Sequence, residues 1–101
     1  MRLLTDEQAK NLPPLYATEN FATKDKIVKI KFFTPDSSWS WYAVEYDKDE
    51  KIFFGYVNGH YPEWGYFSLE ELEQTKGPLG LHIERDIHFK EQPFAQIKEL
   101  Q

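Results

Sequence analysis

The chain of 101 residues carries eight Phe, six Tyr and three Trp, no Cys, and a formal net charge of −5. This length fits a single domain, residues 1–101, with one hydrophobic core. The high aromatic content argues against intrinsic disorder, because disordered segments are poor in aromatic residues. Without cysteine, the chain has no disulfide framework, no thiolate metal site and no thiol nucleophile.

The charges are unevenly distributed along the chain. Residues 24–31 contain four lysines and one aspartate, a net charge of +3, whereas residues 45–73 contain eight acids and two lysines, a net charge of −6. The negative total argues against generic binding of duplex DNA, which usually requires a basic patch. The acidic segment has two interpretations: solvated turns and a solvated helix face, or an acidic surface that meets a basic partner or mimics nucleic acid.

The first predicted elements are a short helix and an extended strap. Thr5 followed by Gln8 matches a capping box, in which the side chain of each residue accepts from the backbone N–H of the other. Pro13 and Pro14 end this helix, and residues 12–16 are expected to form a polyproline-like strap over the core. The N-terminus lacks the apolar stretch of a signal peptide, and no run approaches the roughly 18 apolar residues of a membrane-spanning helix. We therefore expect a cytoplasmic protein with no membrane partner.

Three strands are predicted next, at residues 27–32, 39–46 and 51–57. Val28, Ile30 and Phe32 alternate with lysines, which indicates a half-buried strand. The second segment is rich in strand-favouring aromatics, and residues 34–38 before it are dense in turn formers. Because the connections are short, an antiparallel meander is the simplest arrangement.

The rest of the chain mixes irregular segments with short elements. Residues 58–65 are expected to be irregular, and a second capping box at 68–71 opens a helix of roughly two turns. Residues 81–89 alternate again and predict a fourth strand, and residues 93–100 predict a short closing helix. The predicted fold class is therefore α+β, a small single domain with a three- to four-stranded antiparallel meander sheet and short flanking helices.

A surplus of large aromatic residues on the predicted sheet is the main candidate for binding. Tryptophan is seldom completely buried, and a small domain cannot hide every ring. The candidate binding residues, five aromatics and two flanking lysines, are Trp39, Trp41, Tyr42, Trp64, Tyr66, Lys29 and Lys31. Three interpretations stay open: core packing alone, anchors for a protein partner, and a platform on which unpaired bases stack. The last predicts salt-sensitive binding of single strands, lost in Trp39→Ala or Trp41→Ala.

The fourth predicted strand carries polar residues at every second position, and these are His82, Glu84, Asp86 and His88. Successive members lie roughly 6.5–7 Å apart on one face, too far for the whole row to bind one ion. A neighbouring pair together with His60 could supply a Zn²⁺ site. A solvent-facing strand face is the favoured interpretation, and no metal site is predicted.

Arg85 falls on the apolar face of the same predicted strand. A buried arginine requires a carboxylate or several carbonyl groups, or its burial costs too much. Glu45, predicted to point inward with Trp41 and Ala43, is the candidate partner in a structural ion pair. The sequence contains no Gly-x-Ser-x-Gly elbow, no phosphate loop and no dinucleotide fingerprint, so we predict no catalytic residue and no cofactor.

Four ordered blocks of the chain closely resemble a family of small bacterial and phage proteins classed as a domain of unknown function. The blocks are residues 31–42, 53–57, 65–73 and 77–86, and the opening residues 12–16 with Thr18 and Glu19 also resemble the start of the family. The resemblance covers nearly the whole chain. It implies an origin on plasmids, phages or conjugative elements, sometimes beside DNA-handling and antirestriction proteins. It brings no established activity and no catalytic residues with it.

Together these observations favour a non-enzymatic accessory protein of a mobile genetic element, a phage or a plasmid, that binds a host or mobile-element protein. An antirestriction or other anti-defence role fits that context by association. The alternative is an accessory protein that binds single-stranded nucleic acid. A metal-dependent enzyme that uses the polar row of the fourth predicted strand is less favoured.

Overall fold

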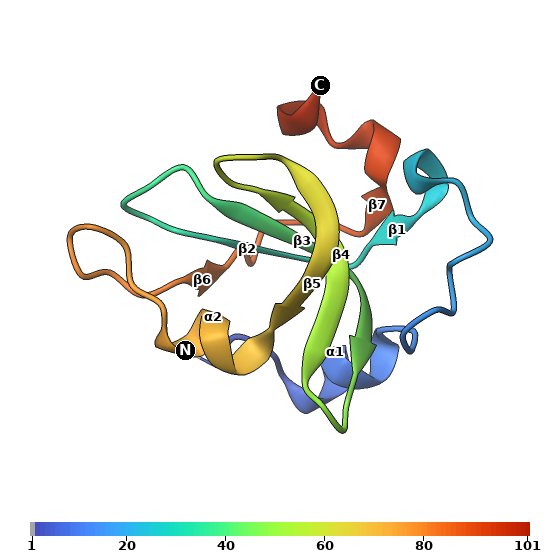
Figure 1. Cartoon of the computed structure of the whole chain (residues 1–101), viewed down its shortest axis with the longest axis horizontal. Helices are drawn as coiled ribbons and strands as arrows, with labels where there is room; N and C mark the ends of the chain where they lie inside the picture. Colours follow the sequence, from blue (N-terminus) through green and yellow to red (C-terminus); the bar gives the residue numbers. More distant parts are fainter. Residues whose placement is uncertain (1) are drawn as a thin grey trace.

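The computed structural model describes residues 2–101, and its centre is a five-stranded antiparallel sheet in the order β5-β4-β3-β2-β6 (Figure 1). The strands are β2 (Ile30–Phe33), β3 (Ser40–Asp47), β4 (Ile52–Asn58), β5 (Glu63–Ser68) and β6 (Glu84–Arg85). A second sheet pairs β1 (Ile27–Val28) with β7 (Gln92–Pro93). The helices are α1 (Asp6–Asn11) and α2 (Leu69–Gln74), and 3₁₀ turns span Thr23–Asp25, Phe94–Gln96 and Lys98–Leu100.

The antiparallel arrangement and the short helices are as predicted, but the sheet is larger than the three to four strands expected. Part of the segment 58–65, predicted to be irregular, belongs to β5, where Gly65 pairs with Gly55 of β4. The predicted fourth strand at 81–89 is also wrong in length, because only Glu84 and Arg85 pair with β2. The chain then turns away, since the Asp86 carboxylate accepts from the backbone N–H of His88 at 2.9 Å. The predicted closing helix is two separate 3₁₀ turns.

Local capping starts both α-helices where the sequence predicts. The Thr5 hydroxyl accepts from the backbone N–H of Gln8 at 3.1 Å, and the Gln8 side chain accepts from the backbone N–H of Thr5 at 3.0 Å. At α2, Ser68 accepts from the backbone N–H of Glu71 at 3.2 Å. The strap after α1 joins the sheet through the carbonyl of Pro13, which accepts from the backbone N–H of Tyr46 at 2.9 Å.

The sheet is covered on both faces, which explains why β3 is buried along its whole interior. In Figure 1 the sheet lies between the two α-helices on one side and the C-terminal 3₁₀ turns on the other. The face toward the helices packs around Phe53, which is fully buried and lies 4.6 Å from the Tyr46 ring and 5.2 Å from the Phe67 ring. The opposite face packs Tyr42 and Val44 against Ile97. This second cover comes from the C-terminal segment.

A β-bulge in β3 changes which residues share a face. Ala43 pairs with Gly55 and Glu45 pairs with Phe54, so Val44 is an extra residue without a partner of its own. Strict alternation predicts that Glu45 lies on the same face as Trp41 and Ala43. The bulge instead turns Glu45 to the face of Phe54. Tyr46 takes the helix-facing side in its place.

Asp36 joins two distant parts of the chain, the turn before β3 and the turn after α2. Its carboxylate accepts from the backbone N–H of Leu79 at 2.8 Å and from that of Leu81 at 3.3 Å. A Cβ at Gly77 would lie only 1.6 Å from the same carboxylate, so a glycine is required for this approach. These contacts connect two of the sequence blocks that carry the family resemblance.

We expect Asp36→Ala to lower the free energy of unfolding by about 1–2 kcal/mol, because two backbone N–H groups lose a charged acceptor. The turn at 77–81 should also become more susceptible to proteolysis. Urea unfolding and limited proteolysis with mass mapping measure the two effects. Asp49→Ala is the matched control at an exposed turn, and it should change stability by less than about 0.5 kcal/mol. Equal losses in the two variants would contradict the assignment.

Candidate functional site

The candidate site is built around the carboxylate of Glu45, which is only 3% exposed. This carboxylate accepts from the backbone N–H of Tyr16 at 2.8 Å, from the backbone N–H of Thr18 at 3.0 Å, and from the Thr18 hydroxyl. Charge-assisted bonds of this kind are stronger than bonds between neutral groups. Glu45 therefore fixes the segment that follows the strap against the sheet.

Lys26 is the second buried charge of the site, with 5% of its surface exposed. Its ammonium donates to the Thr18 carbonyl and, at 3.1 Å, to the Thr18 hydroxyl, and it lies 5.9 Å from the centre of the Phe54 ring. Thr18 thus bridges Lys26 and Glu45 through its hydroxyl. A buried charge is costly unless it is paired and hydrogen-bonded, and here each of the two charges has such partners.

An open cavity of about 280 Å³ lies over this pair of charges. Its lining residues, four of them aromatic, are Tyr16, Glu19, Phe21, Thr23, Lys26, Glu45, Phe54 and Tyr66. Three of the rings are well exposed, Tyr16 at 61%, Phe21 at 55% and Tyr66 at 56%. The cavity therefore has a charged base and an aromatic mouth. We call this cavity and its lining residues the aromatic pocket.

The shape of the pocket mouth depends on an unusual backbone conformation. Tyr16 has a φ of 72°, a value that bulky residues rarely adopt. Its N–H is the one that donates to Glu45, so the buried carboxylate holds the chain in this conformation. Tyr66 lines the same opening, and hydrogen bonding with the Tyr16 side chain is the main cause that raises the pKa of Tyr66.

The structure separates the five aromatic residues singled out in the sequence. Trp41 and Tyr42 are buried in the two opposite cores, and burial is the main cause that raises the pKa of Tyr42. Trp39 is partly buried and meets the His60 ring edge-on at 5.3 Å. Trp64 is partly buried. Tyr66 alone of the five lines the aromatic pocket.

Trp64 belongs to an aromatic cluster beside the pocket. Its ring lies 5.8 Å from Phe54, 5.5 Å from Tyr56 and 4.8 Å from Phe94. The cluster links the C-terminal 3₁₀ turn to β4 and β5. Phe54 is shared, because it contacts both Trp64 and Tyr66, at 5.8 and 5.2 Å. The pocket wall is thus backed by packed rings.

The two candidate lysines are paired with carboxylates of the C-terminal segment. Lys29 lies 3.4 Å from Glu91, and Lys31 contacts Glu99 and lies 3.9 Å from Asp86. The Lys31 ammonium also lies 5.7 Å from the centre of the Tyr42 ring. These pairs connect the tail to β2 and to Lys29, which directly precedes it. They leave little free positive charge on this part of the sheet.

The predicted ion pair between Arg85 and Glu45 is wrong. Arg85 donates to the backbone carbonyls of Arg2 and Leu3, at 2.7 and 2.9 Å, and Glu45 accepts from the 16–18 segment. The bulge at Val44 is the physical reason, because it turns Glu45 to the face opposite the one on which Arg85 pairs beside Phe32. Arg85 is satisfied by carbonyl groups, which is the other solution open to a partly buried guanidinium.

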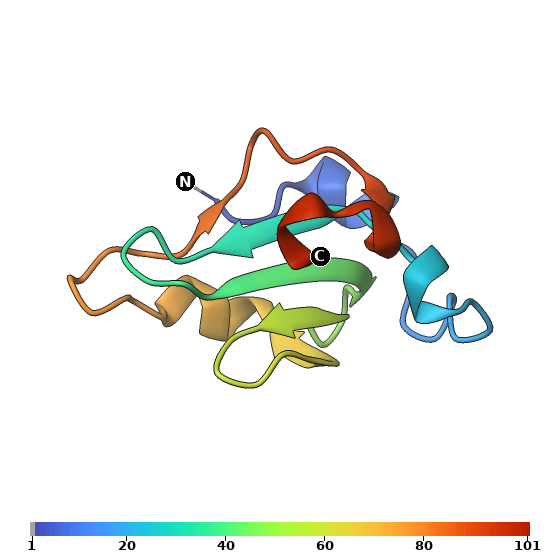
Figure 2. The same ribbon diagram turned by 90° about the horizontal axis from the view of Figure 1, so that it is seen from above.

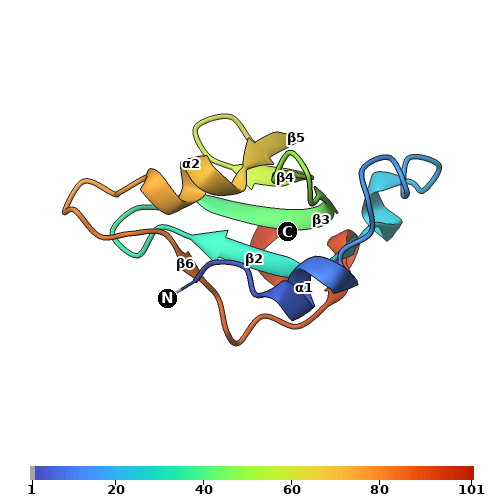
Figure 3. The same ribbon diagram turned by 90° about the horizontal axis from the view of Figure 1, so that it is seen from below.

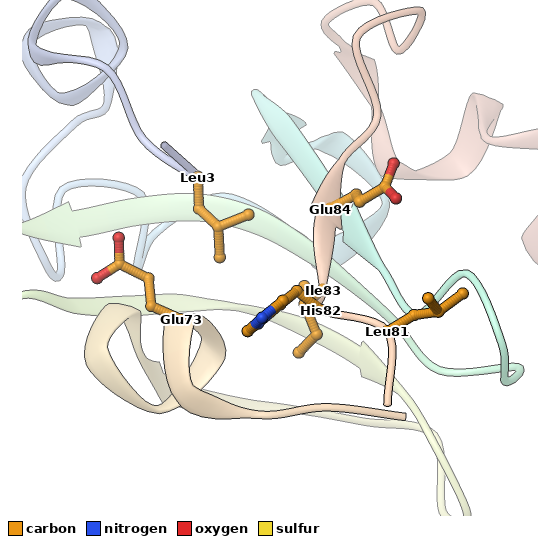
Figure 4. Close-up of a pocket in the computed structure, with 6 residues that line it drawn as sticks. All are labelled: Leu3, Glu73, Leu81, His82, Ile83 and Glu84. Carbon is orange, nitrogen blue, oxygen red and sulfur yellow. The ribbon is translucent and has the colours of Figure 1, made fainter. Parts of the chain in front are cut away.

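A cavity of about 640 Å³ is lined by two members of the polar row of the tail, His82 and Glu84. Figure 4 shows the His82 ring directed into it, the Glu73 side chain on the far side and the Glu84 carboxylate pointing away. Within residues 2–101 no hydrogen bond joins His82 to either glutamate, and no group of three metal-ligating side chains converges. The row is broken at Asp86, which pairs with Lys31. This geometry brings no acid–base pair together.

Sequence reasoning missed most of the aromatic pocket. Phe21 is an isolated aromatic residue in a polar segment, which was the one local sign that this loop carries an exposed ring. In the sequence, Lys26 stands out only as part of the basic run 24–31, and Tyr16 only as part of the predicted strap. Phe54 lies in the predicted strand 51–57, but the sequence does not indicate to which face of the sheet its ring points. These groups are brought together by long-range hydrogen bonds, since Tyr16 and Thr18 donate to Glu45, which lies 29 and 27 positions further along the chain.

Comparison with known proteins identifies the family but no activity. A family model described as protein of unknown function (DUF2958) matches residues 3–97, so the chain belongs to this family. No curated protein and no solved structure matches it. Among the described residues, no helix is long and apolar enough to cross a membrane.

Proposed function

We propose that this member of the DUF2958 family is a non-enzymatic, cytoplasmic accessory protein of a phage or plasmid that binds a partner protein through its aromatic pocket. The partner is a protein of the host or of the mobile element. An antirestriction or other anti-defence role is the form of this proposal that the context of related proteins favours, by association alone.

The observation that carries the proposal is the exposure of Tyr16, Phe21 and Tyr66 around one cavity. Tyrosine and other aromatic residues are enriched in protein interfaces, where they supply large contact area at a low cost in conformational entropy. Exposed rings that gather at one opening are therefore better explained by a partner than by packing. Glu45 and Lys26 fix the walls of the opening before binding, which lowers the cost of ordering them.

The charge around the pocket supports a basic partner. Glu19 lies on its lining, and residues 45–73, which include β4 and β5, have a net charge of −6. Complementary charge increases the rate of association and helps to select the partner. Lys26 is buried and already bonded to Thr18, so Glu19 is the exposed charge on the pocket lining.

Single-stranded nucleic acid is the less supported alternative. Base stacking requires accessible rings beside free cations, as in sites that follow a nucleic-acid backbone. Trp41 and Tyr42 are buried, and Lys29 and Lys31 contact carboxylates. The exposed rings that remain share their cavity with Glu19, an exposed carboxylate that repels phosphate.

The proposal predicts that a partner is retained through Tyr66. Tagged wild-type protein and the Tyr66→Ser and Tyr61→Ser variants are used to capture proteins from a bacterial host lysate. Tyr61 is the matched control, because it is 83% exposed but lies outside the pocket lining. We expect Tyr66→Ser to retain at least about tenfold less of the partner, the effect of losing one interface anchor of 1.4 kcal/mol or more. Tyr61→Ser should retain the wild-type amount.

Two results would contradict the proposal. One is the absence of any specific partner under several conditions of salt and growth phase. The other is equal retention by wild type, Tyr66→Ser and a second pocket variant, Phe21→Ser. Thermal unfolding of each variant shows that a loss of capture comes from the pocket and not from unfolding.

A further inference from the structure

The two edges of the central sheet are protected very differently. β6, at one edge, is only two residues long, and short edge strands resist pairing with other chains. β5, at the other edge, runs for six residues in unbroken register with β4. Its sequence, Glu63 to Ser68, contains no lysine, proline or bulge, which are the usual means of blocking an edge.

The hydrogen-bond register shows which backbone groups of β5 are free. The N–H of Leu69 donates to the carbonyl of Lys51 at 3.0 Å, and this bond fixes the phase of the ladder. In antiparallel pairs only alternate residues exchange bonds with the neighbour. Residues 63, 65 and 67 therefore bond to β4, and the N–H and C=O groups of Trp64 and Tyr66 point away from it. No hydrogen bond to these four groups is found within residues 2–101.

The same two residues carry their side chains on the face that holds the aromatic pocket. Tyr66 lines the pocket, and Trp64 packs against Phe54 on its wall. In Figures 2 and 3, β5 lies at the margin of the sheet, next to β4. The free edge and the pocket are therefore continuous.

We propose that β5 receives an extended segment of the partner protein as a sixth strand, with alternate apolar side chains of that segment entering the aromatic pocket. This inference rests on the proposed protein-binding function and deepens it. In strand addition, main-chain hydrogen bonds supply affinity and side-chain pockets supply specificity. Trp64 and Tyr66 offer two donors and two acceptors, enough for four backbone bonds to the added strand.

The charges at the two ends of β5 select a partner segment and not a second copy of this chain. Glu63 begins the strand, and Glu70 and Glu71 follow it at the start of α2, all three exposed. Antiparallel pairing of two β5 strands centred on the free groups would bring Glu63 of each copy beside the α2 end of the other. That arrangement places like charges together. A segment with lysine or arginine on either side of its apolar residues complements both ends.

The test begins with random 12-residue peptides displayed on phage and selected on the full-length chain. We expect enriched peptides to alternate apolar residues and to carry Lys or Arg at their ends. The best peptide is then labelled with fluorescein, and its affinity is measured by anisotropy for wild type, Tyr66→Ala, Tyr66→Pro and Tyr61→Ala. Both Tyr66 variants lose the ring, but only proline also removes the outward N–H without breaking the bonds to β4.

Tyr66→Pro should bind the peptide at least tenfold more weakly than Tyr66→Ala does, and Tyr61→Ala should bind like wild type. A second measurement uses wild-type protein with peptides N-methylated at single backbone positions. Methylation should cause at least a tenfold loss at alternate positions and less than a twofold loss at the positions between. This series remains decisive if Tyr66→Pro does not fold.

Equal affinities of Tyr66→Ala and Tyr66→Pro, together with N-methylation effects that do not alternate, would overturn the edge proposal and leave the pocket proposal standing. Failure to enrich any peptide, while the lysate partner is still captured through Tyr66, would do the same. Loss of both forms of binding would overturn the proposed function as well. A dimer in sedimentation analysis that Tyr66→Pro converts to a monomer would assign the edge to a second copy instead.

Discussion

Glu45→Ala is expected to lower the free energy of unfolding by about 3 kcal/mol and to abolish partner binding. The variant leaves the backbone N–H groups of Tyr16 and Thr18 without their acceptor, and each unsatisfied buried donor costs roughly 1–3 kcal/mol. It also removes the carboxylate that holds Tyr16 at positive φ, so the pocket mouth loses its shape. Urea unfolding measures the first effect, and the capture experiment measures the second.

Two variants separate the role of Glu45 from a general effect of removing an acid. Glu50→Ala, in the exposed turn between β3 and β4, should change stability by less than about 0.5 kcal/mol and leave capture unchanged. Glu45→Gln keeps an oxygen acceptor but places an amide N–H₂ against the second donor. We expect it to fall between wild type and Glu45→Ala. If Glu45→Ala unfolds at the same urea concentration as wild type, the carboxylate does not hold the segment.

Gly55→Ala should prevent folding or cost more than about 3 kcal/mol, because overpacking in a fixed backbone exceeds the usual range of 1–3 kcal/mol. A Cβ at this position would lie 1.9 Å from the backbone carbonyl oxygen of Tyr42 and 3.1 Å from the Cα of Ala43. Both contacts are with the backbone of the adjacent strand in the middle of the sheet, so neither can move aside without breaking the pairing of β3 and β4. Circular dichroism and thermal unfolding measure the loss.

Gly65→Ala is the matched control for Gly55→Ala. The two glycines face each other across β4 and β5, but a Cβ at Gly65 meets no atom within 4 Å. Replacing it should leave stability unchanged or raise it by roughly 0.5–1 kcal/mol, because alanine loses less conformational entropy on folding than glycine. Equal destabilisation by the two substitutions would show that a general property of glycine in strands, and not the close approach at Gly55, explains the loss.

The face on which the Glu45 side chain lies shows why the candidate site could be predicted only in part. Its side chain was assigned to a face by alternation, and a single extra residue at Val44 reversed that assignment. The bulge leaves no mark in the local sequence, because Val44 is a β-branched residue of the kind that is common at regular strand positions. Tyr66 is among the residues that the sequence singles out and it lines the aromatic pocket, whereas Phe21 and Tyr16 are not among them, because no local pattern shows that their segments fold back toward β4 and β5.

The sequence alone determined those features that depend on neighbours along the chain. The starts of both α-helices follow from hydroxyl and carboxamide groups within four residues, and β2, β3 and β4 follow from period-two alternation and aromatic content. The acidic character of residues 45–73 and the lack of thiol chemistry are also fixed by composition.

Only the tertiary structure decided which faces and edges remain available. The seventeen aromatic residues are more than a core of this size can bury, so the composition predicts that some rings are exposed. It does not indicate which rings these are. That choice depends on long-range contacts: the C-terminal segment covers Tyr42, the helices cover Phe53, and Glu45 holds Tyr16 outward. Because backbone pairing and burial join residues far apart in sequence, the free edge of β5 and the aromatic pocket beside it exist only once the chain has folded.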